Sequence, residues 1–443
     1  MIRAFRDPVR LIPLLFAVAI AIGTALLMLP FASASGQATP LVTAFFTSTS
    51  AVAVTGLIVV DTATYWSWFG QVVILVLFQI GGFGIMTAAT LFGLMAGRGF
   101  GLRERMATHV ERNRLEVGDA RSVLALVLKI TIAVEAVVAA ILVARLMVSY
   151  DSEFGPALWH GVFHAVSAFN NAGFSSYSDS VMGFQTDAVF LVPIMAAVIV
   201  TALGFPVMQD VRHKGVRWSQ WTLHTKITVM GTAVLLLVGF GAILAKEWTN
   251  PDTLGPMSVG AKILNAGFHS VMPRTAGFNS LDVGAFRGET LLMNYVLMFI
   301  GGGSAGTAGG VKITTFFVLL AVVYSEVKGR RDASLFGRRF GHGIERQALT
   351  VFVAAATLII LASMYILAIT RLPMEQVLFE TISAFSTVGL STGITADLPP
   401  SALVVLCALM FVGRVGTITV ATALALGAEP QPFRYPEENP IVG

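Results

Sequence analysis

The chain has 443 residues, of which 55% are hydrophobic and only 12% are charged. Because a typical soluble domain carries about 25% charged residues, this composition excludes an ordinary soluble protein and predicts an integral membrane protein. The formal net charge is only +4, and the basic residues lie in short clusters beside long apolar runs, which disfavours nucleic-acid binding. The single cysteine, Cys407, excludes a disulfide within the chain.

The apolar runs follow a regular order along the chain. A hydrocarbon core of ~30 Å requires about 20 apolar residues in a helix, and runs of that order occupy residues 11–30, 70–97, 123–148, 188–208, 223–245, 291–325, 349–369 and 401–427. Each successive pair of runs encloses a shorter apolar segment, at 41–53, 157–170, 259–272 and 374–386. The short segments are too short to span, so the sequence predicts the order span, half-helix, span, four times over.

Each short segment ends at a similar phrase that contains glycine. The four phrases are Val54-Thr55-Gly56, Asn171-Ala172-Gly173, Thr275-Ala276-Gly277 and Thr387-Val388-Gly389. Glycine allows backbone conformations in which successive carbonyls point the same way, and rings of carbonyls can replace the hydration shell of a potassium-sized ion. The pattern therefore predicts an all-α membrane fold, with four helix–half-helix–helix units around a central pore of pseudo-four-fold symmetry.

The predicted units are residues 1–97, 98–210, 211–327 and 328–427, followed by a tail at 428–443. We expect the half-helices to begin near four prolines, because proline in the first helical turn sacrifices no hydrogen bond. These prolines are Pro40, Pro156, Pro256 and Pro373. A half-helix that ends at a filter directs the negative end of its dipole toward the ion.

One predicted span contains a glycine-rich break. Six glycines fall within the ten residues 301–310, and each destabilises a helix by about 1 kcal/mol relative to alanine. The break predicts a flexible loop at mid-membrane depth that acts as a gate; close helix packing through small residues is the alternative. The gate residues would be Gly301, Gly302, Gly303, Ser304, Gly306, Thr307, Gly309, Gly310 and Lys312. A dinucleotide site is excluded because no strand precedes the G-x-G-x-x-G pattern.

Arg414 lies within the last apolar run. A buried arginine in a span costs several kcal/mol unless it faces water or a partner. It either pairs with Glu135 or places its charge near the ion path as part of the gate, and we favour the gate. For Glu135 we favour a structural role. His160 and His164 have the spacing of a metal pair, but without a third ligand nearby we expect them to pack at the half-helix edge.

Lys and Arg concentrate in five segments: the first ten residues, 98–121, 212–217, 328–346 and the tail. The positive-inside rule predicts that these segments and both termini are cytoplasmic. Eight arginines are candidates for docking an acidic or nucleotide-bearing partner, with attraction to anionic lipid as the alternative. They are Arg103, Arg105, Arg112, Arg114, Arg330, Arg331, Arg338 and Arg339.

The four units, the filter glycines, the glycine-rich break and the arginine of the last span together resemble the Trk/Ktr/HKT superfamily of potassium transporters. The resemblance covers essentially the whole chain. It is strongest to KtrB-type membrane subunits of bacterial Ktr systems, because no extra helix pair precedes the first unit and the ending Phe433–Glu438 is similar.

The resemblance implies a potassium filter at the four glycines and a gate at the 301–312 loop. It also implies a bacterial inner-membrane homodimer, docked on a cytoplasmic ring of nucleotide-binding regulatory subunits of the KtrA type. ATP or ADP would bind to that partner, this chain would hold no cofactor, and Na⁺ would be a candidate activator. Val388 stands where two other units have alanine and the first has threonine, so the filter should be less symmetric, and less selective, than that of a tetrameric channel.

Two other functional classes fit the sequence less well. A secondary, ion-coupled transporter with a midplane substrate site usually has two inverted repeats, whereas this sequence has four similar units. An enzyme is disfavoured because the spans carry no paired carboxylates, no H-E-x-x-H motif and no Ser/Lys pair.

Overall fold

The computed structural model describes residues 8–96, 120–330 and 332–416. Its secondary structure is almost entirely helical, as the sequence predicts, apart from one antiparallel hairpin of β1 (Ser334–Leu335) and β2 (Arg338–Arg339). Arg103, Arg105, Arg112, Arg114, Arg331 and the predicted tail lie outside the described residues.

The α-helices alternate between long and short elements along the chain. They are α1 (Pro8–Leu27), α2 (Leu41–Val52), α3 (Trp68–Ala96), α4 (Ala120–Ser149), α5 (Phe154–Asn170), α6 (Ala188–Leu203), α7 (Phe205–Lys214), α8 (Leu223–Glu247), α9 (Val259–Val271), α10 (Gly288–Phe299), α11 (Ile313–Val327), α12 (His342–Ile369), α13 (Met374–Ser386) and α14 (Pro400–Phe411). A π-helical turn, η7 (Val412–Gly416), follows α14. The four half-helices are thus α2, α5, α9 and α13. Three begin at or within two residues of the expected proline, whereas α9 begins later, at Val259, because the Ser258 side chain caps it.

Three helical segments of the described chain are by themselves long and apolar enough to cross a membrane: Ala125–Ser149, Leu223–Glu247 and Gly343–Ile369. The pair α6 and α7 also qualifies when taken together, but the two helices meet at 91°. The remaining apolar helical segments are shorter: Leu11–Leu27, Leu41–Val52, Trp68–Gly84, Ile313–Val327 and Pro400–Gly416.

Two of the expected spans are broken, not one. The predicted span 291–325 is interrupted between α10 and α11, as expected, but 188–208 is also interrupted at Gly204. Gly204 has φ +88°, which glycine adopts without strain. Pro206 then lies in the first turn of α7, where its missing N–H costs nothing. The expectation of a continuous span at 188–208 was therefore wrong.

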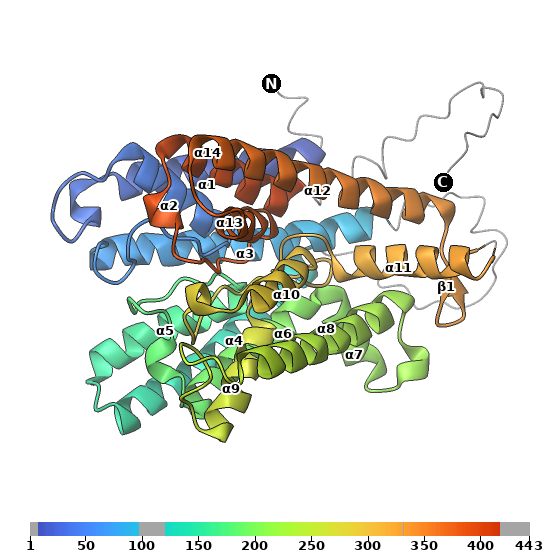
Figure 1. Ribbon diagram of the computed structural model, residues 1–443, viewed down its shortest axis with the longest axis horizontal. Helices are drawn as coiled ribbons and strands as arrows, with labels where there is room; N and C mark the ends of the chain where they lie inside the picture. Colours follow the sequence, from blue (N-terminus) through green and yellow to red (C-terminus); the bar gives the residue numbers. More distant parts are fainter. Residues whose placement is uncertain (1–7, 97–119, 331, 417–443) are drawn as a thin grey trace.

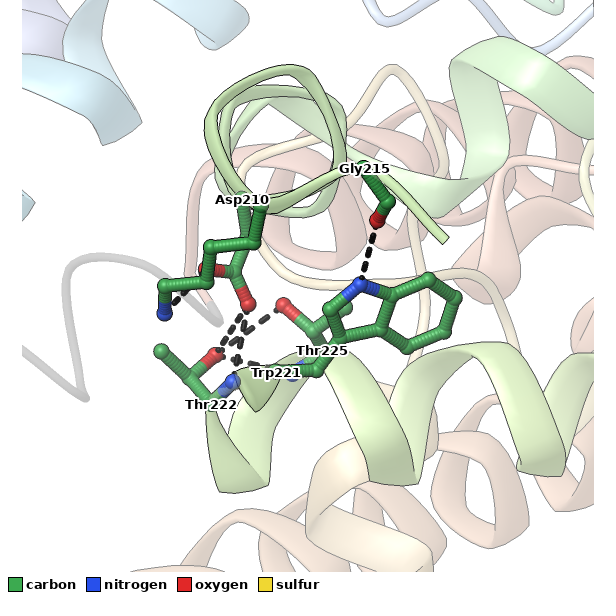
Figure 2. Close-up of polar contacts among 6 residues, drawn as sticks. Asp210, Gly215, Trp221, Thr222 and Thr225 are labelled. Carbon is green, nitrogen blue, oxygen red and sulfur yellow. Dashed lines mark hydrogen bonds and ion pairs between the residues drawn. The ribbon is translucent and has the colours of Figure 1, made fainter. Parts of the chain in front are cut away.

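A polar corner between α7 and α8 fixes the direction of α7 after this bend (Figure 2). Asp210 accepts hydrogen bonds from the Thr222 N–H at 2.8 Å and the Thr222 hydroxyl at 3.1 Å. The Lys214 ammonium lies 2.6 Å from the other carboxylate oxygen of Asp210. The Trp221 indole donates to the Gly215 carbonyl at 2.8 Å. These bonds join the end of one unit to the start of the next.

The helices close into a ring. Contacts join α3 to α5, α6 to α9 and α10 to α13, and α14 returns to α2. Figure 1 shows the helices from the two ends of the chain, α1 to α3 and α12 to α14, together on one side of the molecule. Large apolar side chains such as Leu15, Ile22, Leu237 and Leu361 are more than half exposed, which suits an outer surface that faces lipid.

Candidate ion filter and gate

The four half-helices lead into loops with the same unusual backbone. The first residue of each glycine phrase has a positive φ, at Val54 (56°), Asn171 (59°), Thr275 (77°) and Thr387 (50°). The glycine two positions later also has a positive φ, at Gly56 (90°), Gly173 (70°), Gly277 (70°) and Gly389 (95°). A left-handed non-glycine residue costs of order 1–3 kcal/mol and persists only where the surroundings impose it. Because this conformation recurs at four equivalent positions, the surrounding fold imposes it in each of the four loops.

Hydrogen bonds at the helix ends explain three of these conformations. In the first loop the Thr55 N–H donates to the Ser50 carbonyl at 2.8 Å, and the Val54 N–H donates to the Ala51 carbonyl at 3.0 Å. This pair of bonds is the Schellman motif, in which a left-handed residue ends the helix. The second and fourth loops repeat it through Ala172–Ser167 and Val388–Ser383.

The third loop departs from this pattern. Ser270 lies one residue farther from its glycine than the corresponding serines do, with Pro273 and Arg274 between. Arg274 is buried, and both of its Nη atoms donate to Thr232 of α8, at 3.3 Å each. None of the ion pairs found among the described residues includes it. The sequence analysis missed Arg274, although aligning the four serine–glycine spacings would have revealed the extra residue.

The four glycines touch one another in a closed ring. A Cβ added to Gly56 would lie 3.0 Å from the Gly173 Cα, and one added to Gly173 would lie 3.0 Å from the Gly277 Cα. A Cβ on Gly277 would lie 3.1 Å from the Gly389 Cα, and one on Gly389 would lie 3.1 Å from the Gly56 Cα. Each would also meet the carbonyl oxygen that precedes the next glycine. The backbone around this ring is therefore too close for any side chain.

An acidic cavity of about 450 Å³ opens on one side of the ring. All four glycines line it, together with Asp61, Asp179 and Asp282, and no described lysine or arginine does. Partial burial raises the pKa of Asp61, but hydrogen bonds from Ser178 and Thr64 outweigh this and hold that pKa below its ordinary value. The carboxylate is therefore charged at neutral pH. An acidic cavity beside a narrow ring raises the local concentration of cations.

The 301–312 loop lies on the other side of the ring. A Cβ on Gly309 would lie 2.9 Å from the Ser386 carbonyl oxygen, and one on Gly310 would lie 3.1 Å from the Ser386 Cβ. Ser386 ends α13, and the chain then runs through Thr387 and Val388 to Gly389, which lines the cavity. The ring therefore separates the loop from the acidic cavity.

The other part of the loop packs into the bend between α6 and α7. The Gly303 N–H donates to the Ala202 carbonyl at 2.7 Å, and the Phe205 N–H donates to the Ala305 carbonyl at 3.3 Å. The ends of the loop are joined through Gly301 N–H to the Val311 carbonyl, at 2.9 Å. The loop is thus held by ordered hydrogen bonds to a neighbouring unit, so close packing through small residues is part of its role.

Arg414 also contacts this loop. It lies in η7, is 2% exposed, and donates from Nη1 to the Thr307 carbonyl. Its Nε and Nη2 atoms have no hydrogen-bond partner among the described residues. Glu135 interacts instead with Gln79 and Asn170. The alternative of an Arg414–Glu135 ion pair was therefore wrong. Lys312, at the other end of the loop, donates to the Ala308 carbonyl.

The two histidines before the second loop have structural partners. His160 Nδ1 lies 2.7 Å from the Ser176 hydroxyl, and His164 Nε2 lies 2.9 Å from the Ser175 hydroxyl. The described residues contain no group of three side chains suited to a metal ion. The histidines therefore brace the backbone that follows Gly173.

Comparison with known proteins identifies the family of this chain. The family model of the TrkH cation transport proteins matches residues 3–433. The Ktr system potassium uptake protein B of Bacillus subtilis is 38% identical over 98% of this chain and 97% of its own length. The potassium/sodium uptake protein NtpJ of Enterococcus hirae is 36% identical over 100% of this chain and 98% of its own length. These matches confirm the resemblance to the Trk/Ktr transporters, which are not enzymes.

A solved structure supports the fold. The crystal structure of the potassium transporter TrkH from Vibrio parahaemolyticus superposes with a TM-score of 0.72 at 20% identity. The superposition covers 96% of this chain and 85% of that chain. The helical architecture is therefore shared over nearly the whole molecule.

Proposed function

Because the chain belongs to the TrkH family of cation transport proteins, we propose that it is the membrane-embedded, potassium-conducting subunit of a cation uptake system. The observation that carries this proposal is the closed ring of Gly56, Gly173, Gly277 and Gly389. Carbonyls crowded around one axis can replace the water shell of a monovalent cation. The acidic cavity would supply cations to the ring, and the three-residue phrases that end in these glycines would form the filter.

Potassium is the proposed ion because glycine occupies all four ring positions and because relatives are named as potassium uptake proteins. The Enterococcus hirae relative is named as a potassium/sodium uptake protein. We therefore propose Na⁺ as an activator or second substrate, and expect K⁺ over Na⁺ selectivity to be moderate.

The 301–312 loop is the proposed gate. It lies against the end of α13 on the side of the ring away from the acidic cavity, and Arg414 bonds to it. An ion that passed the ring would meet this loop next. The positive charge of Arg414 would add electrostatic repulsion to the obstruction.

The proposed assembly is a homodimer in a bacterial cell membrane with both termini in the cytoplasm. Two observations support a regulatory partner of the KtrA type, which would carry the ATP or ADP. A relative is a Ktr system protein, and Arg338 and Arg339 are exposed on β2. The four-unit division at residues 1–97, 98–210, 211–327 and 328–427 remains part of the proposal.

Potassium transport can be tested in two systems. The chain should restore growth at low K⁺ to bacteria that lack their potassium uptake systems. The purified protein, reconstituted in liposomes with a K⁺ gradient across the membrane, should transport radioactive rubidium. The rubidium flux is measured with and without Na⁺, and in each case with and without a regulatory subunit. Absence of rubidium flux from a folded, correctly inserted protein under all four conditions would refute the proposal.

A secondary, ion-coupled transporter is the second candidate, favoured by the two broken spans α6–α7 and α10–α11, which touch at their breaks. Broken helices near the midplane are typical of that class. Flux driven by a K⁺ diffusion potential alone distinguishes the two. A pore conducts under that condition, whereas a coupled transporter needs the gradient of its second ion.

A further inference from the structure

Thr201 connects the side chains behind the proposed filter. It lies near the end of α6, is fully buried, and its hydroxyl donates to the Asn171 Oδ1 atom at 2.9 Å. Asn171 is the left-handed residue of the second glycine phrase. Its Nδ2 atom donates in turn to the Thr275 hydroxyl at 3.4 Å. Thr275 holds the equivalent position in the third phrase, so one side-chain amide joins two filter loops to α6.

The same turn of α6 also holds the proposed gate. The Gly303 N–H donates to the Ala202 carbonyl, and the Phe205 N–H donates to the Ala305 carbonyl. A Cβ on Gly306 would lie 2.7 Å from the Thr201 carbonyl oxygen. Residues 201–205 therefore touch the filter through a side chain and the gate through the backbone.

We propose that Thr201 is a positioning residue that couples the gate to the filter through Asn171, so that ion selectivity depends on the position of the 301–312 loop. The proposal rests on the proposed function of the ring and the loop. When the loop moves, it shifts the end of α6, and the Thr201 hydroxyl carries that shift to Asn171 and so to the backbone before Gly173. Hydrogen bonds and packed backbone with two arrangements can transmit such coupling.

The coupling is specific to the second and third units. The equivalent position in the first unit is Val54, which has no polar side-chain atom. In the fourth unit it is Thr387, whose hydroxyl has no partner among the described residues. Only Asn171 has a side chain that donates to one element while accepting from another. The filter should therefore respond to the gate unevenly around the ring.

Three acceptors lie within hydrogen-bond distance of the Thr201 hydroxyl, which has only one proton to donate. Besides Asn171 Oδ1 it lies 2.9 Å from the Ala197 carbonyl and 3.2 Å from the Val198 carbonyl. Both carbonyls belong to the same helix as Thr201, whereas no other hydrogen bond from the described residues reaches Asn171 Oδ1. Substitution by valine would leave this buried oxygen without a donor, and that loss is the costly part of the change.

A matched control is available in α4. Thr131 is also buried, and its hydroxyl donates only within its own helix, to the Val127 carbonyl at 2.9 Å. Thr131→Val thus removes the same atoms and a bond within the helix, without touching the filter or the loop. Thr201→Ser provides the opposite control, because it keeps the hydroxyl and removes only a methyl group.

The test measures the ratio of rubidium to sodium flux through purified protein in liposomes. Thr201→Val should lower this ratio roughly two- to tenfold, the range expected for one buried hydrogen bond. Thr201→Ser should restore the ratio and Thr131→Val should leave it unchanged. Gly306→Ala adds a methyl group that presses on the Thr201 carbonyl, so it should also change the flux ratio. If the two sites are coupled, the factor by which Gly306→Ala changes the ratio should differ between the parent protein and the Thr201→Val variant.

Equal ratios in Thr201→Val and Thr131→Val would overturn the proposal, as would independent effects of Gly306→Ala and Thr201→Val. If Thr201→Val is not recovered as folded protein, Thr201→Ala takes its place under the same two criteria, because the shorter side chain cannot clash. Lack of flux through the unsubstituted protein would instead refute the proposed function. The two failures are therefore distinguishable.

Discussion

At the scale of single residues, the ring depends on the absence of a side chain at its four glycines. Gly56 combines a φ of +90° with close neighbouring backbone, since the Ala172 carbonyl oxygen would lie 2.4 Å and the Gly173 Cα 3.0 Å from a Cβ at this position. Gly36 provides a natural comparison, because it has a φ of +71° but nothing within 4 Å of that position. Both sites have a left-handed backbone that would be strained in any other residue, whereas of the two only Gly56 has the crowding that defines the ring.

We therefore predict that Gly56→Ser weakens discrimination of K⁺ over Na⁺ more than it reduces expression. The added side chain would displace the Ala172 carbonyl and the Gly173 backbone. Relative permeabilities in liposomes measure the effect, with Gly36→Ser as the control for strain alone. Relative permeabilities equal to those of the parent would show that Gly56 does not belong to the filter.

Arg414 is the second position with a residue-scale prediction. Its guanidinium is buried and anchored to the loop through the Thr307 carbonyl. Arg414→Gln removes the positive charge and shortens the link, so we expect basal rubidium flux to rise severalfold. Arg274→Gln is the comparison, since it removes another buried guanidinium that bonds Thr232 and not the loop. An equal rise in both variants would mean that Arg414 has no specific role in the gate.

At the scale of elements, the sequence predicted most helices because their signals are local. Runs of about 20 apolar residues, prolines at helix starts and glycines at helix ends recur in each unit. The bend at Gly204 was missed because one glycine before Phe205-Pro206 is a weak signal inside an apolar run. Its 91° angle depends on the 301–312 loop, whose Ser304 carbonyl occupies the space where a Gly204 side chain would be. A contact between segments so far apart in the chain cannot be predicted from the local sequence.

The sequence predicted the candidate site about as far as it predicted the helices. The four glycines were found from their recurrence, but their ring contacts and the left-handed residues before them follow from tertiary closure. Arg414 and the loop were each identified as unusual, whereas the bond between them joins residues far apart in the chain. Thr201 carried no signal at all, because a threonine near the end of an apolar helix is ordinary in sequence.

The loop itself supports an element-scale prediction. Deleting Gly303 to Gly309 removes the bonds to Ala202 and Arg414 and would remove the proposed gate from the ion path. We expect basal flux to rise and dependence on a regulatory subunit to disappear. Thermal stability in detergent must be measured in parallel, because the deleted residues also pack against α6. Loss of transport from a protein that remains folded and dimeric would instead assign the loop to packing.

At the scale of the whole molecule, the ring of helices has two different ends. The acidic cavity opens on one side of the filter, and the hairpin of β1 and β2 lies beyond α11, toward the same end of the molecule as α7 (Figure 1). Trp218, in the corner that follows α7, packs edge-on against Phe336 of the hairpin at 5.8 Å. The hairpin thus contacts both α11, which follows the 301–312 loop, and the corner before α8. A partner bound there would act on elements next to the proposed gate.

We predict that reversing Arg330, Arg331, Arg338 and Arg339 to glutamate lowers the yield of complex with a regulatory ring on co-purification. Of the described members of this group, Arg338 and Arg339 are exposed on β2, and Arg330 stacks on Tyr324 at 5.7 Å. Complementary charge steers docking and weakens as salt rises, so the deficit should be largest at low ionic strength. Reversal of Lys246, in the last turn of α8, and of Arg371, just after α12, controls for net charge. The alternative is attraction to anionic lipid, worth about 1 kcal/mol per basic residue. That alternative predicts weaker binding of all reversed variants to anionic liposomes and an unchanged yield of complex at both low and moderate salt.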